Sequence, residues 1–294
     1  MVLLEGGVRS GPAVYGQGFL PAAYQGTSFR PGSSPILNLR PPKGMQDKDQ
    51  RDLLATLNQM NERHLSSRNN DSELAARMAS YELAFKMQMA APEATDVSGE
   101  SEATKKLYGL DDPKSADFGG RCLLARRLVE RGVRFVQVWS GNGMNATDWD
   151  GHIGCDKNHL DRAAQTDKAV AGLLTDLKAR GLLDSTLVIW GGEFGRSPTS
   201  DGGPGGSEGR DHNPYGFTIW MAGGGVKGGK VIGNTDELGL RAIDNPVHLN
   251  DLHATILGLL GLDHLKLTYH YLGRDFRLTD VGGKTALMSQ LRKP

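Results

Sequence analysis

A short apolar run that ends in a polar, glycine-rich loop is the feature that most constrains the fold of this chain. Residues Leu187–Trp190 are apolar, and Gly191-Gly192-Glu193-Phe194-Gly195-Arg196 follows them directly. Such a run is typical of a buried strand in a parallel sheet. In open α/β sheets, ligand-binding groups lie just beyond the carboxyl ends of the strands. The pattern therefore predicts a functional site at the loop that carries Glu193.

The surrounding sequence favours an α/β fold with three layers, α/β/α, and a mainly parallel sheet. Apolar patterns predict further strands at 133–139 and 217–222, and helices at 121–130, 160–180 and 250–261. Glycines at 132, 181 and 261 are placed to end these helices. Alternation of helices and strands predicts parallel strands covered on both faces.

We expect a single domain over 1–294 with three regions. Residues 1–45 are rich in glycine, proline and aromatic side chains, which indicates an irregular surface segment. Residues 46–118 are predicted as a helical insertion, with helices at 47–64 and 72–90, and residues 119–294 as the α/β core. The apolar stripe of the second helix is interpreted as core packing rather than as a cofactor site.

Composition excludes several classes of function. Lys plus Arg and Asp plus Glu both total 34, so the formal net charge is zero, and nothing favours nucleic acid or an anionic membrane surface as a partner. No run approaches the roughly 20 apolar residues of a transmembrane helix, and the first residues lack the pattern of a secretory signal. The two cysteines, Cys122 and Cys155, imply no disulfide framework.

Three polar clusters around the strand at 187–190 suggest a metal-centred hydrolase. In the first, Asp150 and His152 can share a divalent metal, because a loop allows two residues at this spacing to converge. Asp148 is the alternative carboxylate. His159 is a less favoured further ligand, as is Cys155.

The other two clusters add Glu193 and His212. Glu193 lies at the strand end as a candidate ligand, with a salt bridge to Arg196 as the alternative interpretation. His212 follows a glycine-rich stretch, and it can bind metal, act as a general acid or orient the loop. The planar guanidinium of Arg196 suits a phosphate or sulfate, and Arg210 is a second candidate for anion binding.

The ordered set of these motifs resembles the bacterial family called domain of unknown function 1501, which is abundant in planctomycetes. The resemblance covers nearly the whole chain. It includes the following stretches: Gly18-Phe19-Leu20-Pro21-Ala22-Ala23-Tyr24-Gln25-Gly26-Thr27, Trp149-Asp150-Gly151-His152, Gly191-Gly192-Glu193-Phe194-Gly195-Arg196, Gly209-Arg210-Asp211-His212-Asn213 and Asp251-Leu252-His253-Ala254-Thr255.

That family is placed in the alkaline phosphatase-like superfamily with the sulfatases, so the resemblance implies the three-layer fold and an extracytoplasmic location. It also implies that an opening strand with a ligand aspartate, and the nucleophile, are missing from the start of this chain. Glu193-Phe194-Gly195 stands where the superfamily has Asp-His-Gly, and Phe194 cannot bind metal. A two-zinc site of the phosphatase kind is therefore in question, and no catalytic nucleophile is assigned.

The resulting first hypothesis is a metal-dependent, sulfatase-like hydrolase of sulfate or phosphate monoesters, on a small molecule or a glycan. The expected metal ligands are Asp150, His152, Glu193 and His212, and the histidines favour zinc over calcium. The alternative is a catalytically inactive homologue that binds sulfated or phosphorylated glycans. A purely structural outer-layer protein is the third hypothesis. The oligomeric state is left open.

Overall fold

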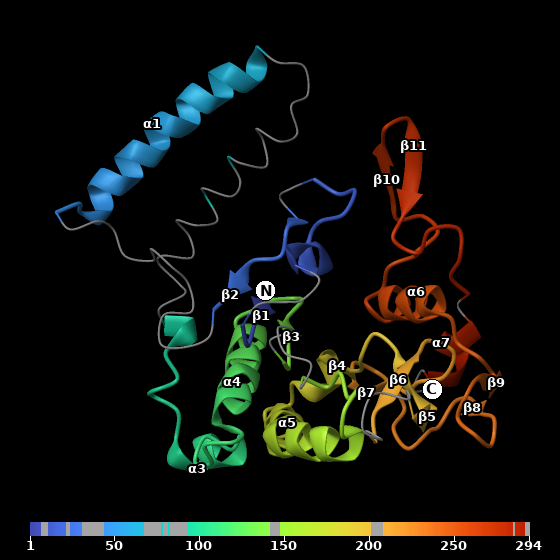
Figure 1. Cartoon of the computed structure of the whole chain (residues 1–294). Coiled ribbons are helices and arrows are strands. Elements are labelled where there is room, and N and C mark those ends of the chain that lie inside the picture. Colours follow the sequence, from blue (N-terminus) through green and yellow to red (C-terminus); the bar gives the residue numbers. More distant parts are fainter. Residues whose placement is uncertain are drawn as a thin grey trace. The chain divides into compact units, whose positions relative to one another are not determined.

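The computed structural model describes residues 1–6, 11–21, 24–30, 44–67, 78, 82, 93–141, 148–200, 208–284 and 286–291. The chain is a mixed α/β protein (Figure 1). Its contacts divide it into two compact units. The first unit contains Met1–Asn145 with Lys168–Val170, and the second contains Ala146–Asp167 with Ala171–Pro294. The predicted helix at 72–90 lies outside the described residues, apart from single helical positions at 78 and 82.

A small parallel sheet and one covering helix form the core of the first unit. The strand order is β2-β1-β3, with β1 at Val2–Leu3, β2 at Ser28–Phe29 and β3 at Gln137–Val138. Buried side chains of β1 and β2 pack with those of helix α4, which spans Ala116–Glu130. The strand predicted at 133–139 is therefore confirmed only over two residues, and the sequence pattern predicts neither β1 nor β2.

Three further elements of the first unit lie fully within the described residues: a 3-10 helix and two α-helices. The 3-10 helix η1 spans Gly11–Tyr15, helix α1 spans Asp47–Ser66 and helix α3 spans Glu102–Leu107. Helix α1 confirms the helix predicted at 47–64, and its first turn has a capping box in which Gln46 and Asp49 satisfy each other's backbone N–H groups.

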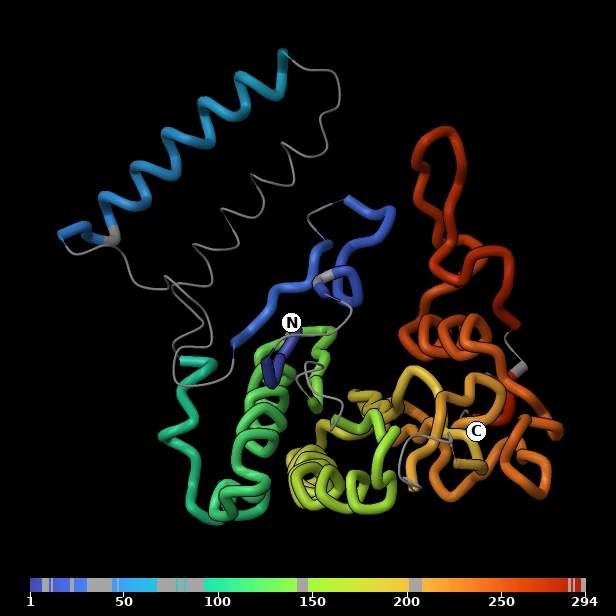
Figure 2. Tube along the Cα trace, in the orientation of Figure 1, coloured from blue at the N-terminus to red at the C-terminus, as the bar shows by residue number. Residues whose placement is uncertain are grey.

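In the described part of the second unit, a loop and most of a long helix are followed by four antiparallel strand pairs. Figure 2 shows the course of this part of the chain from green to red. Helix α5 starts five residues before the predicted position and ends, as expected, before Gly181, whose φ of 71° suits a helix C-terminus. The elements are α5 (Cys155–Ala179), η3 (Leu183–Ser185), β4 (Leu187–Trp190), β5 (Gly195–Ser200), β6 (Arg210–Asn213), β7 (Trp220–Gly223), β8 (Asn234–Thr235), β9 (Ala242–Asp244), α6 (Leu249–Leu259), β10 (Thr268–Tyr271), β11 (Arg274–Arg277) and α7 (Ala286–Leu291).

Strand β4 is present as predicted, but the predicted parallel direction and burial are wrong. It pairs with β7 in antiparallel orientation, and its Ile189 and Trp190 are 39% and 40% exposed. The physical reason lies in the connection. Parallel neighbours need a crossover, usually a helix, whereas the described chain between β4 and β7 contains the β5–β6 hairpin. No described helix is both long and apolar enough to cross a membrane.

Candidate metal centre

Two segments of the second unit form the scaffold of the site: the loop before α5 and the β5–β6 hairpin. The backbone N–H of Arg210 donates to the carbonyl of Gly151 at 3.0 Å, and that of Cys155 donates to Glu208 at 3.2 Å. Gly209 lies between these contacts, where a Cβ atom would stand 1.8 Å from the carbonyl oxygen of His152. The loop and the start of β6 are therefore packed backbone against backbone.

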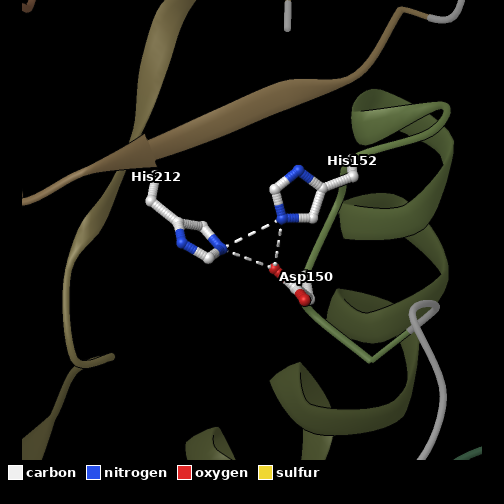
Figure 3. Close-up of side chains that lie close together, drawn as sticks. All are labelled: Asp150, His152 and His212. Carbon is white, nitrogen blue, oxygen red and sulfur yellow. Dashed lines mark hydrogen bonds and ion pairs between the residues drawn. The ribbon is translucent and has the colours of Figure 1, made fainter. Parts of the chain in front are cut away.

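Asp150, His152 and His212 converge on one point within this scaffold (Figure 3). Asp150 Oδ1 lies 3.1 Å from His152 Nε2 and 3.0 Å from His212 Nε2, and the two Nε2 atoms are 3.0 Å apart. One ligand atom from each residue falls within 4.8 Å of the other two. Asp150 and His152 are partly buried and His212 is exposed, so the group is open to solvent on one side.

The hairpin register explains the position of His212. Arg196 and His212 are direct partners across β5 and β6, so their side chains lie on the same face of the hairpin. The ring of Phe194 packs 4.3 Å, centroid to centroid, from the ring of His212. Phe194, which cannot ligate a metal, thus supports a side chain that can.

The carboxylate of Asp150 is held in its ionised form. Partial burial would raise the pKa of Asp150, but the hydrogen bonds from Arg196 and His212 and the nearby positive charge of Arg196 lower it to about 2. The Arg196 contact is short, at 2.6 Å from Nη2 to Asp150 Oδ1. Asp150 is therefore a charged ligand candidate at neutral pH.

The structure brings together three of the four predicted metal ligands. Glu193 is exposed and is not part of the described three-residue group. The predicted alternative of a Glu193–Arg196 salt bridge is not found either, since Arg196 pairs with Asp150. The second predicted anion-binding residue, Arg210, donates to the backbone carbonyl of Pro198.

The alternative ligands are engaged elsewhere. Asp148 forms an ion pair with Arg162, and its side chain is only 6% exposed. His159 Nε2 lies 3.3 Å from the carbonyl oxygen of Trp149. Cys155 is buried, which raises the pKa of its thiol and keeps it protonated at neutral pH. The choice of Asp150 over Asp148 as the carboxylate near His152 agrees with this arrangement.

A row of tryptophans next to the cluster was not predicted. The Trp149 ring meets the Trp190 ring edge-on at 6.3 Å, and Trp190 stacks on Trp220 at 6.4 Å with an interplanar angle of 4°. Two sequence signals could have indicated this row. Trp149 directly precedes Asp150, and Trp190 ends the strand that leads to Glu193.

A mixed α/β chain with an aspartate and two histidines at one point defines a protein with a candidate divalent-metal site. The chain belongs to the family described as Protein of unknown function (DUF1501), whose model matches residues 1–288. The predicted family membership is thereby confirmed. No curated protein and no solved structure matches the chain.

Proposed function

We propose that this protein binds one zinc ion through Asp150, His152 and His212 and hydrolyses phosphate or sulfate monoesters at that ion. The observation that carries the proposal is the convergence of the three ligand atoms within 4.8 Å. Two imidazole nitrogens and one carboxylate oxygen fit zinc, and catalytic zinc sites use such three-residue sets with a further position left for water or substrate. Calcium would instead require a set made of oxygens.

The chain's own residues prepare the site for this ion. Arg196 keeps Asp150 ionised, and the β5–β6 register presents His212 Nε2 to the same point as His152 Nε2. When bound, zinc would polarise an ester oxygen and offset negative charge on the group that departs. The exposed side of His212 leaves a path for an ester from solvent. The participation of Glu193 as a further ligand stays a prediction.

The sequence resemblance extends the proposal to the alkaline phosphatase-like superfamily and to an extracytoplasmic location. The extracytoplasmic location is tested by fractionating source cells and locating the protein with an antibody. Its presence in the cytoplasmic fraction alone would contradict an exported protein.

A second candidate function is the binding of sulfated or phosphorylated glycans without turnover. Trp190 favours it, because this side chain is 40% exposed and is stacked on Trp220 close to the loop of Asp150. Flat, exposed indole rings offer the kind of surface on which the apolar face of a sugar ring packs.

Metal analysis of the purified chain is the decisive test. We expect one equivalent of zinc in the wild type and in a His270→Ala control, whose imidazole lies on the β10–β11 hairpin. A His152→Ala, His212→Ala double variant is expected to lose the zinc. A folded wild-type chain that binds no zinc would contradict the proposal.

The two candidate functions differ in turnover. Zinc-dependent release of p-nitrophenol from its phosphate or sulfate ester, absent in the double variant, supports the hydrolase. Stoichiometric zinc with binding of a sulfated oligosaccharide, but without turnover across a broad ester panel, supports the glycan-binding protein.

A further inference from the structure

We infer that Arg196 is a positioning residue for the metal ligands and does not bind the anionic group of a substrate. This inference rests on the proposed zinc site. It replaces the anion-binding role that the sequence suggested for Arg196, and it assigns to this residue the task of fixing Asp150 relative to His212.

Both terminal nitrogens of Arg196 are already used by the chain itself. Nη2 donates to Asp150 Oδ1 at 2.6 Å and to the carbonyl of Trp149 at 3.2 Å, while Nη1 donates to the carbonyl of Arg210 at 3.3 Å. The side chain is only 16% exposed. A phosphate or sulfate would have to displace these acceptors to gain the same guanidinium, so this arginine is poorly placed to hold an anion.

The acceptors of Arg196 come from the two segments that carry the ligands. Trp149 and Asp150 lie in the loop that also holds His152, and Arg210 lies two residues before His212 on β6. The planar guanidinium of Arg196 therefore links the loop that carries Asp150 and His152 to strand β6, which carries His212. A lysine ammonium is a single point charge and cannot make this link in the same way.

Asp150 Oδ1 shows why this link matters for a metal. The oxygen is approached by His152, by His212 and by Arg196. Of these three partners, Arg196 is the one that is not itself a proposed ligand. Partners of this kind orient ligating carboxylates, and their loss typically weakens metal affinity about 10- to 100-fold.

Zinc affinity, measured by competition with a chromophoric chelator, tests the inference without any activity assay. We expect Arg196→Met to weaken zinc binding by about 10- to 100-fold and to change the visible spectrum of the cobalt-substituted protein. Arg196→Lys keeps the positive charge but loses the planar set of N–H donors. Its zinc affinity should therefore lie between that of Arg196→Met and that of the wild type. The control is Arg274→Met, which removes an exposed arginine of the β10–β11 hairpin that pairs with Asp280, and it should leave both readouts unchanged.

Inorganic phosphate, titrated into the zinc-loaded proteins, separates the two roles of Arg196. Unchanged zinc affinity and cobalt spectrum in Arg196→Met, combined with weaker phosphate binding, would overturn the inference and restore the anion-binding role. If Arg196→Met does not fold, as judged by circular dichroism, Arg196→Lys decides, and wild-type zinc affinity in that variant would count against positioning. Absence of zinc from the wild type would instead refute the proposed function itself, and this inference with it.

Discussion

At the scale of single residues, Gly209 sets how closely the two ligand-bearing segments approach. A Cβ atom at this position would lie 1.8 Å from the carbonyl oxygen of His152, a distance that no relaxation of a side chain can relieve because the contact is with backbone. We predict that Gly209→Ala forces the loop and β6 apart. The free energy of unfolding should fall by about 2–4 kcal/mol, and zinc affinity should fall with it. Urea denaturation and zinc titration measure the two effects.

Gly228→Ala is the matched control for this substitution, because a Cβ atom there meets nothing within 4 Å. The control should retain wild-type stability and zinc affinity. Equal behaviour of the two alanine variants would show that the close approach at Gly209 has no energetic consequence.

Some residues of the site could be predicted from the sequence, and others could not. Asp150 and His152 are two positions apart on a loop, and His212 stands in a polar cluster, so residue type and local spacing were enough to nominate them. The contact of Arg196 with Asp150 was not predictable, because it joins positions 46 residues apart and depends on the register of β5 and β6. The exposed position of Glu193 depends on the same hairpin geometry.

At the scale of elements, Glu100 connects the segment before α3 to helix α4. Its carboxylate pairs with Arg126 at 2.8 Å and Arg127 at 2.5 Å, and the side chains of Glu100 and Arg126 are only 9% and 2% exposed. Removing one partner of a buried ion pair leaves its charge less well compensated, even though Arg126 would keep its second pair, with Glu130. We predict that Glu100→Gln lowers the free energy of unfolding by about 3 kcal/mol at pH 7. Glu102→Gln, which breaks an exposed pair with Lys105, is the control and should cost less than about 1 kcal/mol.

The difference in free energy of unfolding between the wild type and Glu100→Gln should depend on pH in a defined direction. Burial would raise the pKa of Glu100, but hydrogen bonds from Arg126 and Arg127 outweigh it and hold the pKa below the ordinary value of 4.5. A lowered pKa means that the stabilisation is complete above about pH 4.5 and is lost as the pH falls further. The difference between wild type and Glu100→Gln should therefore shrink below that pH. A difference that grows on acidification would contradict the ion-pair explanation.

Helices and strands differ in how well the sequence predicted them. Helices α1, α4, α5 and α6 follow from local periodicity and terminal signals, and all four were predicted with errors confined to their ends. Strand pairing is not local. Val2 pairs with Gln137, although most of the first unit's sequence lies between them. Strands of two residues also carry too few side chains to show a pattern. The apolar run of β4 identified a strand but contained no information on its partner's direction.

At the scale of the whole molecule, the three proposed ligands all belong to the unit formed by Ala146–Asp167 and Ala171–Pro294. A ligand that binds only the folded state stabilises it by RT ln(1 + [L]/Kd), about 2.7 kcal/mol at 100 times Kd. We predict that this stabilisation appears as slower amide hydrogen exchange around residues 150–155 and 208–213. These segments are linked by the backbone hydrogen bonds between Gly151 and Arg210 and between Cys155 and Glu208.

The parallel sheet of the first unit provides an internal control, because β1, β2 and β3 are packed on α4 and contain none of the proposed ligands. Exchange there should not change when zinc is added, since local protection follows the stability of the cooperative segment that opens. The His152→Ala, His212→Ala variant should show no protection by zinc in either unit. Suppose that zinc slows exchange equally in β1 and in residues 150–155 of the wild type. Both units would then open together, and the stability gained from the metal could not be assigned to the second unit alone.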